Sequence, residues 1–211
     1  MARPKPAATS RRKPSQARSV VTVNAIFEAC IQVFNQTGPD SLTTTRVAER
    51  AGVSVGTLYQ YFPDRQAMML SLLERHLIRI TEDVSAVCEA NKGTTLEVMI
   101  PNIVHAMVDA KMAHPEEALA LYPVTLEAQG KALENRVLYQ GQLAICDALA
   151  SASGVRFTDL RMVSFLIGTA VMGPLQAVLA AGAAPTLVRK VREHLGVMLT
   201  AYARTLAIPV D

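Results

Sequence analysis

Apolar residues recur every three or four positions along most of this 211-residue chain, which is the spacing of amphipathic helices. Glycine, proline and capping residues separate the stretches that show this spacing. No run of alternating β-branched residues predicts a strand. The pattern therefore predicts an all-α protein of about nine helices, near residues 18–37, 43–51, 54–62, 65–90, 94–114, 115–122, 123–153, 158–181 and 186–206.

The first four predicted helices are separated by residues that favour particular backbone conformations. Glycine adopts the left-handed conformation that ends a helix, and Ser, Thr and Asp side chains accept hydrogen bonds from the free N–H groups at a helix start. Proline removes a backbone donor and ends the helix before it. The predicted terminators and caps in this part of the chain are Gly38, Thr43 or Thr44, Gly52, Ser54, Pro63 and Asp64.

The later helix boundaries depend on similar signals. Pro123 is predicted to begin the seventh helix, Thr158 to cap the eighth and Thr186 to cap the ninth. Pro174 lies inside the predicted eighth helix, where it leaves the carbonyl of Ala170 without its usual hydrogen bond. We therefore expect a kink there, which would make a deformable wall in the second half of the chain.

The basic residues are concentrated at the N-terminal end of the chain. Residues 1–66 hold nine Lys or Arg against four Asp or Glu, although the net charge of the whole chain is only +3. This distribution favours a polyanionic partner at that end, with solubility as the alternative explanation. Residues 1–17 are rich in Pro, Ala, Ser and basic side chains, which predicts a disordered arm. Arg11, Arg12 and Lys13 either reach a DNA minor groove or belong to an idle tail.

Cysteine and histidine usage argues against a metal site or an enzyme. Cys30, Cys88 and Cys146 are widely separated and odd in number, which predicts buried free thiols in a reducing cytoplasm rather than disulfides. The four histidines are scattered, and no hydrolase, protease or nucleotide-binding motif is present. We therefore expect no catalytic residues, no metal and no cofactor.

One apolar stretch is long enough to raise the question of a membrane. Residues 162–184 carry no charge over 23 positions. They include several Ala, Gly and polar residues, and charged amphipathic helices flank them, which favours a helix buried in a soluble assembly. A membrane-attached regulator is the alternative.

Residues 44–63 satisfy the steric requirements of a helix-turn-helix. Gly52 permits the tight turn, and Leu58 is apolar and can anchor the second helix to the first predicted helix. On a helical wheel, Gly56 and Gln60 lie opposite Leu58, on a face that carries hydroxyl and amide groups but no acid. Small residues and hydroxyl groups on such a face are suited to the phosphate backbone of DNA.

The segment TTTRVAERAGVSVGTLYQYFPDRQAMM, residues 43–69, resembles the DNA-binding domain of the TetR family of transcriptional regulators. The resemblance extends over about residues 20–75. It implies a helix-turn-helix domain over 18–66 and a helical ligand-binding and dimerisation domain over 67–211. It also implies phosphate contacts by Thr44, Thr57, Tyr59, Tyr61 and Arg65, with Ser54 capping the recognition helix, and approach to base edges by Thr45, Arg46, Val55, Gly56 and Gln60. Arg65 replaces the lysine usual at its position in the family.

The same resemblance implies a dimer formed by the last two helices and a small-molecule effector. Independently, the last helix carries apolar residues at steps of three and four, and the preceding helix carries small residues that allow close helix contact. An intramolecular core would use part of the same stripes. The predicted interface residues are Gly168, Gly173, Ala177, Val188, Val191, Leu195, Met198 and Tyr202.

The effector is the least defined partner, although apolar side chains with a few polar groups predict a cavity for an apolar or amphipathic molecule. The predicted lining is Met99, Ile103, Met107, Tyr122, Leu126, Gln129, Leu133, Val137 and Phe165, with Tyr139 as a further polar anchor. Together these features predict a cytoplasmic, homodimeric repressor that binds a near-palindromic operator and is released by its effector. The alternative is a helix-turn-helix protein that binds DNA without an effector.

Overall fold

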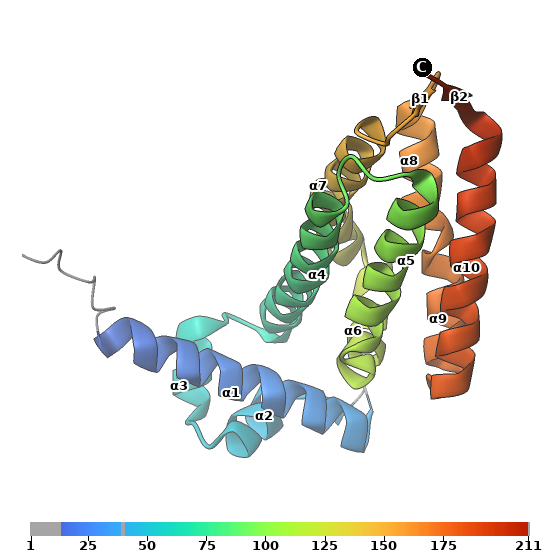
Figure 1. Ribbon diagram of the computed structural model, residues 1–211. Helices are drawn as coiled ribbons and strands as arrows, with labels where there is room; N and C mark the ends of the chain where they lie inside the picture. The colour runs from blue at the N-terminus through green and yellow to red at the C-terminus, as the bar shows by residue number, and fades with distance from the viewer. Residues whose placement is uncertain (1–13, 39–40, 211) are drawn as a thin grey trace, which may run out of the picture. The chain divides into compact units, whose positions relative to one another are not determined.

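The computed structural model describes residues 14–38 and 41–210, and these form helices connected by short loops, with two three-residue strands (Figure 1). The predicted all-α fold class is confirmed. The chain divides between Met68 and Met69 into two compact units. Helix α1 (Pro14–Thr37) begins inside the segment predicted as a disordered arm, and the remainder of that segment, including Arg11, Arg12 and Lys13, lies outside the described residues.

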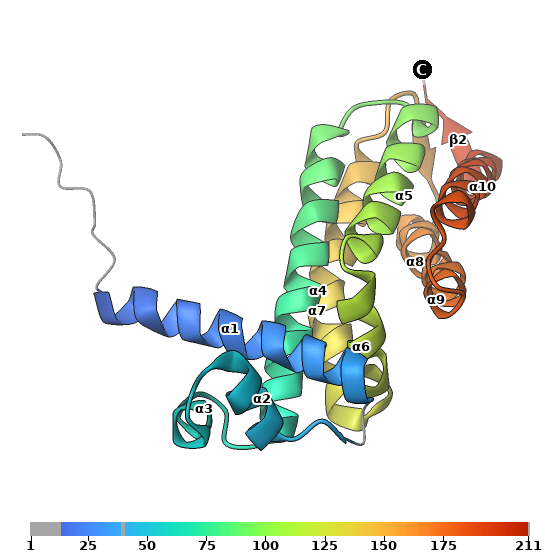
Figure 2. The same cartoon turned by 90° about the horizontal axis from the view of Figure 1, so that it is seen from below.

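The first unit contains α1, α2 (Thr44–Ala51) and α3 (Val55–Tyr61), with α1 running across the other two (Figure 2). Its core is small and closely packed. Ile26 and Cys30 on α1, Ala48 on α2 and Leu58 on α3 are each at most 1% exposed. The rings of Phe27 and Phe62 meet with their centroids 5.4 Å apart, which fixes the end of α3 to α1.

The second unit is a bundle of longer helices. Helix α4 (Arg65–Ala90) begins at the end of the first unit and is continuous into the second. It is followed by α5 (Leu96–Met112), α6 (Pro115–Leu126) and α7 (Ala128–Ala150). Helices α8 (Leu160–Ala170), α9 (Met172–Ala180) and α10 (Pro185–Leu206) complete the unit. An apolar core that includes side chains from α4, α5, α7, α8, α9 and α10 holds it together.

The boundary between α6 and α7 differs from the prediction. Pro123 lies inside α6 rather than at the start of the next helix, and the chain bends instead at Glu127, whose backbone is extended. Gly130 shows why the bend is sharp: a Cβ atom at this position would lie 1.8 Å from the carbonyl oxygen of Val124. Only glycine fits here, because the start of α7 lies against the last turn of α6. Gly130 is therefore the residue in the sequence that marks the boundary between the two helices.

The apolar stretch predicted as one helix is divided into α8 and α9 at Val171. The break falls between Ala170 and Pro174, as expected for a proline that leaves the carbonyl four residues earlier unpaired. Asp159 caps α8 through a 3.0 Å hydrogen bond from the backbone N–H of Met162, a role that the sequence had assigned to Thr158. Similarly, α10 begins at Pro185, with Ala184 rather than Thr186 at the cap position.

Two short strands were not predicted. Strand β1 (Val155–Phe157) pairs antiparallel with β2 (Ala207–Pro209), with Arg156 opposite Ile208. They join the loop after α7 to the end of α10. Three residues are too few to show an alternating pattern, so the pairing arises from the tertiary contact and not from local preference.

By length and composition, residues Leu160–Ala180 form a stretch that could cross a membrane, and 44% of its most apolar window is buried inside the molecule. Val163, Ile167 and Leu175 from this stretch belong to the core of the second unit. Core helices of soluble proteins have this same character.

Candidate DNA-binding surface and ligand cavity

The helix-turn-helix is formed by the capping interactions that the sequence predicted. The hydroxyl of Thr43 accepts a hydrogen bond from the backbone N–H of Arg46 at 3.3 Å, which caps α2. Gly52 ends α2 in the left-handed conformation, with φ of 68°. The hydroxyl of Ser54 accepts from the backbone N–H of Thr57 at 2.9 Å and caps α3. The local sequence therefore fixes the turn and the start of the recognition helix.

One face of α3 is exposed and carries small or hydrogen-bonding residues. Leu58 is fully buried, and Gly56, Tyr59 and Gln60 are exposed, as the helical wheel predicted. The geometry of Gly56 is informative because nothing in the fold requires glycine there. A Cβ at Gly56 would meet only the hydroxyl of Ser54, at an ordinary contact distance of 3.7 Å, and its φ is not positive. Gly56 is the second residue of α3, and glycine costs a helix up to roughly 1 kcal/mol relative to alanine, so neither packing nor helix stability accounts for glycine here.

The other residues predicted to contact DNA lie on α2, at the end of α3 and at the start of α4. The hydroxyl groups of Thr44 and Tyr59 are 3.1 Å apart and join α2 to α3. Arg46 is exposed, and its guanidinium donates a 3.0 Å hydrogen bond to the carbonyl of Ser41, which holds it at the start of α2. Thr45 and Arg65, which were also predicted to contact DNA, are exposed.

Four predicted contact residues are partly covered by the protein itself, and Thr44 on α2 is one of them. Val55 and Thr57 are half-buried on α3. Tyr61 is also half-buried, with its ring centroid 6.5 Å from that of Phe62. Their contact with a partner would use the edges of the side chains that remain accessible.

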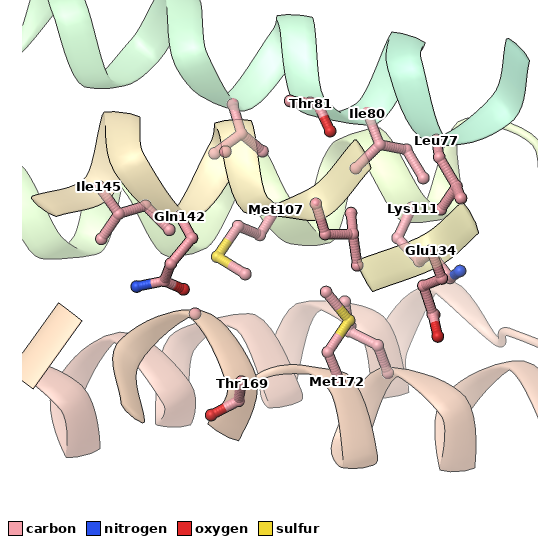
Figure 3. Close-up of a pocket in the computed structure, with 15 residues that line it drawn as sticks. Leu77, Ile80, Thr81, Met107, Lys111, Glu134, Gln142, Ile145, Thr169 and Met172 are labelled. Atoms are coloured by element: carbon pink, nitrogen blue, oxygen red, sulfur yellow. The ribbon is translucent and has the colours of Figure 1, made fainter. Parts of the chain in front are cut away.

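The second unit contains a cavity of about 120 Å³ among α4, α5, α7, α8 and α9 (Figure 3). Its walls are mostly apolar, with Ile80 from α4, Met107 from α5, Ile145 from α7 and Met172 from α9. A wider cleft of about 740 Å³ adjoins it. The two share Lys111, Glu134, Gln142, Thr169 and other lining residues, so they lie side by side, and we call them the narrow interior and the wide mouth of the cavity.

The polar groups of this space are few and unevenly placed. Lys111 and Glu134 lie together at one end of the cavity, and Gln142 lies at the other (Figure 3). The amide of Gln142 donates a 3.0 Å hydrogen bond to the hydroxyl of Ser164. Burial lowers the pKa of Lys111, a shift that the negative charge of Glu134 partly opposes. The hydroxyl of Thr81 is buried in the wall, and no hydrogen-bond partner for it is found among the described residues.

A buried polar cluster lies next to the mouth of the cavity. The Nδ1 atom of His76 is 3.1 Å from Oε1 of Glu117, and Arg79 donates a 3.0 Å hydrogen bond to the same oxygen. Burial lowers the pKa of His76, so the ring is neutral near pH 7 despite the opposing effect of Glu117. Burial alone would raise the pKa of Glu117, but the hydrogen bond from His76 and the neighbouring charges outweigh it and lower the pKa.

These protonation states define the tautomer of His76. A carboxylate accepts hydrogen bonds only, so Nδ1 carries the proton and donates to Glu117. The Nε2 atom is then an acceptor. It is buried, no hydrogen-bond partner for it exists among the described residues, and His76 lines the cavity mouth. The cluster was missed in the sequence because its members are far apart along the chain.

The residues predicted to line the ligand cavity fall into three groups. Met107 lines the interior, while Tyr122, Leu126, Tyr139 and Phe165 line the mouth. Met99 and Ile103 are fully buried in the core and line neither part, because they lie two turns and one turn before Met107 along the same side of α5. The remaining predicted residues lie outside this space: Gln129 and Leu133 line a separate shallow cleft, and Val137 lines none of the clefts described here.

The predicted dimer seam also needs revision. Leu195 is buried in the core, and Val188, Val191 and Tyr202 pack against it, so this stripe of α10 faces the same chain. Gly168 is buried too, and a Cβ there would lie 2.6 Å from the side-chain oxygen of Gln142. A stripe at steps of three and four fits an intramolecular and an intermolecular contact equally well, so sequence spacing cannot separate them.

Other members of the predicted interface are exposed on the last helices, together with apolar residues that were not predicted. On α10, Val197 is 74% exposed and Met198 51% exposed. Gly173 and Ala177, also predicted for the interface, are exposed on α9. Exposed large apolar residues on α8 are Met162, Phe165 and Leu166.

A helix-turn-helix followed along the chain by a helical unit with an apolar cavity is an arrangement typical of DNA-binding regulators. Residues 26–72 match the family model described as bacterial regulatory proteins, tetR family. Residues 95–202 match that of the tetracyclin repressor-like C-terminal domain. The chain belongs to the TetR family, a family of regulatory proteins and not of enzymes.

Curated relatives match only part of the chain. The HTH-type transcriptional repressor KstR of Mycobacterium tuberculosis is 36% identical over 84 residues, which cover 39% of this chain and 38% of that protein. The nucleoid occlusion factor SlmA of Haemophilus ducreyi is 29% identical over 113 residues, which cover 53% of this chain and 55% of that protein. The matched stretches therefore span about half or less of these relatives.

Solved structures resemble the chain over most of its length. The fatty acid degradation regulator FadR of Bacillus halodurans has a TM-score of 0.70 at 17% identity, covering 90% of this chain and 97% of that one. FadR of Bacillus subtilis, in complex with stearoyl-CoA, has a TM-score of 0.69 at 14% identity, covering 84% and 97%. At these identities the likeness shows the fold alone.

Proposed function

We propose that this protein is a cytoplasmic, homodimeric transcriptional repressor that leaves its operator when a small apolar or amphipathic molecule occupies the cavity. The exposed face of α3 reads DNA, and the space lined by Met107 and Phe165 receives the effector. The two helix-turn-helix units of a dimer, which we call its heads, would enter successive major grooves of a near-palindromic operator.

The observation that carries the DNA-binding part is the exposed glycine of α3. Gly56 has open space beside it and a helical backbone, so the fold would tolerate alanine and the helix would gain stability from it. Exposed hydroxyl and amide groups surround the position, and Thr43 and Ser54 fix both helices. Close approach of a DNA backbone or base edge explains the residue where packing does not.

The effector part is supported by the cavity and by the continuity of α4. This helix starts at Arg65, shortly after the end of α3, and Asp64 caps its first turn by accepting a hydrogen bond from the backbone N–H of Ala67. Further along, the same helix contributes Leu77 and Ile80 to the cavity wall. A ligand that favours another position of α4 would change the spacing of the two heads. A bias of a few kcal/mol is sufficient to change operator occupancy substantially. Two of the similar proteins support a ligand-responsive repressor: KstR is named a transcriptional repressor, and FadR of Bacillus subtilis was solved in complex with stearoyl-CoA.

The proposed dimer uses the apolar side chains left exposed on α8 and α10. Val197 and Met198 on α10 and Met162 on α8 are each at least half exposed. Burying such a patch between two copies provides the association free energy that one chain alone leaves unused. The two-fold axis of such a dimer would relate two identical helix-turn-helix units, one from each chain, that bind DNA together.

The test is fluorescence anisotropy with a labelled duplex from the region upstream of the chain's own gene, beside a scrambled duplex of equal length. The protein should bind the first more tightly, and Gln60→Ala should change the sequence preference. Gln140→Ala on α7, also exposed, is the matched control and should leave binding unchanged. Equal affinity for both duplexes would overturn sequence-specific DNA binding.

The effector requires a second measurement, in which pools of apolar metabolites are screened for thermal stabilisation and operator release together. Specific DNA binding with neither effect would favour the effector-independent alternative. Recovery of the expressed protein in the membrane fraction would favour the membrane-attached alternative, for which Leu160–Ala180 is the candidate segment.

A further inference from the structure

Lys111 is the one cationic side chain that reaches both parts of the cavity, among the residues the structure describes. It lies in the last turn of α5 and is half-buried. Within the described residues, no hydrogen bond reaches it and no carboxylate lies within 4.0 Å of its ammonium group. A cation withdrawn from water normally has a partner, because desolvation of an unpaired charge is costly.

The nearby acid does not fulfil this role. Glu134 lies beside Lys111 at one end of the cavity (Figure 3), but its carboxylate accepts a 2.9 Å hydrogen bond from Lys131. Lys131 lies at the exposed rim and lines only the mouth. The mouth therefore contains two lysines against one acid, and His76 is neutral there. The net charge at this end of the cavity is positive.

The interior leads away from Lys111 and is mostly apolar, with Thr81, Gln142 and Thr169 as its other polar side chains besides Glu134. Met107, Ile80 and Met172 line the interior, and the amide of Gln142 lies at its far end (Figure 3). Gln142 is already hydrogen bonded to Ser164. A molecule that fills this space would have a long apolar portion and a single charged end.

We propose that the effector is an amphipathic carboxylate, whose apolar body fills the interior and whose carboxylate forms an ion pair with Lys111. This inference deepens the proposed function and rests on the cavity being the effector site. The carboxylate would supply the partner that Lys111 lacks and would offset its burial. Charge-assisted hydrogen bonds of this kind are about twice as strong as neutral ones.

The test uses three probes with the same apolar chain and different ends: decanoate, decanol and decylamine, each below its micelle concentration. Calorimetric titration of the full-length protein should give at least about a tenfold tighter dissociation constant for decanoate than for decanol. Decylamine should bind most weakly. Operator release is measured separately, so that decanoate binding without release would leave the head-group inference intact and overturn only the proposed function.

Variants at Lys111 assign the effect to one residue. Lys111→Met should reduce the affinity for decanoate to that for decanol, while leaving decanol unchanged. Lys131→Met removes the same charge at the rim and should retain most of the preference for decanoate. Lys111→Gln, which keeps a polar end, provides a second variant if the first does not fold.

Thermal unfolding of the ligand-free variants distinguishes a ligand contact from a structural ion pair. If Lys111 has no partner in the empty protein, Lys111→Met should raise the melting temperature. A lowered melting temperature for both Lys111→Met and Glu134→Gln would show that the two residues stabilise each other, and would overturn the proposal. Failure of decanoate to bind, equal or tighter binding of decanol or decylamine, or an unchanged preference in Lys111→Met would also overturn it.

Discussion

The hydroxyl groups of Thr44 and Tyr59 lie 3.1 Å apart and join the first helix of the helix-turn-helix to the recognition helix. Tyr59 is about half exposed, so one side of its hydroxyl is held by the protein and the other is available to a phosphate. The hydrogen bond restricts the side chain before any partner arrives. Such restriction reduces the entropy that is lost on binding.

We predict that Tyr59→Ala and Arg65→Ala lower the affinity for operator and scrambled DNA alike. Phosphate contacts position a protein without reading bases, so the ratio of the two affinities should stay nearly constant. Arg65→Ala should also flatten the salt dependence by about one phosphate contact. Anisotropy titrations across a series of salt concentrations provide both values, and a change in operator preference from Tyr59→Ala would contradict its role.

Gly56→Ala should have opposite effects on folding and binding. The added methyl meets only the Ser54 hydroxyl at 3.7 Å, so stability should rise, by up to roughly 1 kcal/mol in urea unfolding. Operator affinity should fall, because the methyl occupies the surface that DNA approaches. Ala132→Gly on α7 is the opposite change at an exposed helical position and should lower stability without affecting DNA binding. Unchanged operator affinity in Gly56→Ala would remove the main support for the exposed face of α3 as the DNA-binding surface.

Val197→Glu should convert a dimer to a monomer while the chain remains folded. Val197 is 74% exposed, so the charge is tolerated in one chain but would be buried between two. Light scattering should show the lower mass, and operator affinity should fall with it. Val98→Glu on α5, where the side chain is 48% exposed, is the matched control and should remain dimeric.

Leu195→Glu tests the revised assignment of the α10 stripe. Leu195 is 5% exposed and belongs to the core of its own chain. An unpaired charge at such a site costs several kcal/mol, so this variant should lose its folded structure by circular dichroism. A folded monomer would instead support the original placement of Leu195 at the dimer seam.

The cysteines should differ sharply in reactivity. Burial raises the pKa of the Cys30 thiol to about 12 and that of Cys88 to about 11. Raised values keep both thiols protonated at pH 8, and the thiolate is the reactive form. Mass spectrometry after maleimide treatment should therefore find Cys146, which is half-buried, labelled first in the folded protein. Cys146→Ser should abolish this early labelling, and all thiols should react in denaturant.

The sequence was sufficient for features that depend on neighbouring residues. Thr43, Gly52 and Ser54 determine the helix-turn-helix, because caps and left-handed turns are local backbone preferences. The same holds for the exposure of Gly56 and Gln60, which follows from helical spacing once Leu58 is buried. The break before Pro174 was likewise predictable from the missing backbone donor of proline.

Tertiary structure alone decided features that depend on which surfaces meet. Leu195 faces the core and Val197 faces outward although both are apolar residues of one helix, because α10 buries the side that contacts α5. The corner at Glu127 depends on the contact between Gly130 and Val124 rather than on Pro123. Lys111 lies in an apolar cavity only because α4, α5, α7 and α9 pack together around it. The sequence of α5 alone does not predict which helices will surround this side chain.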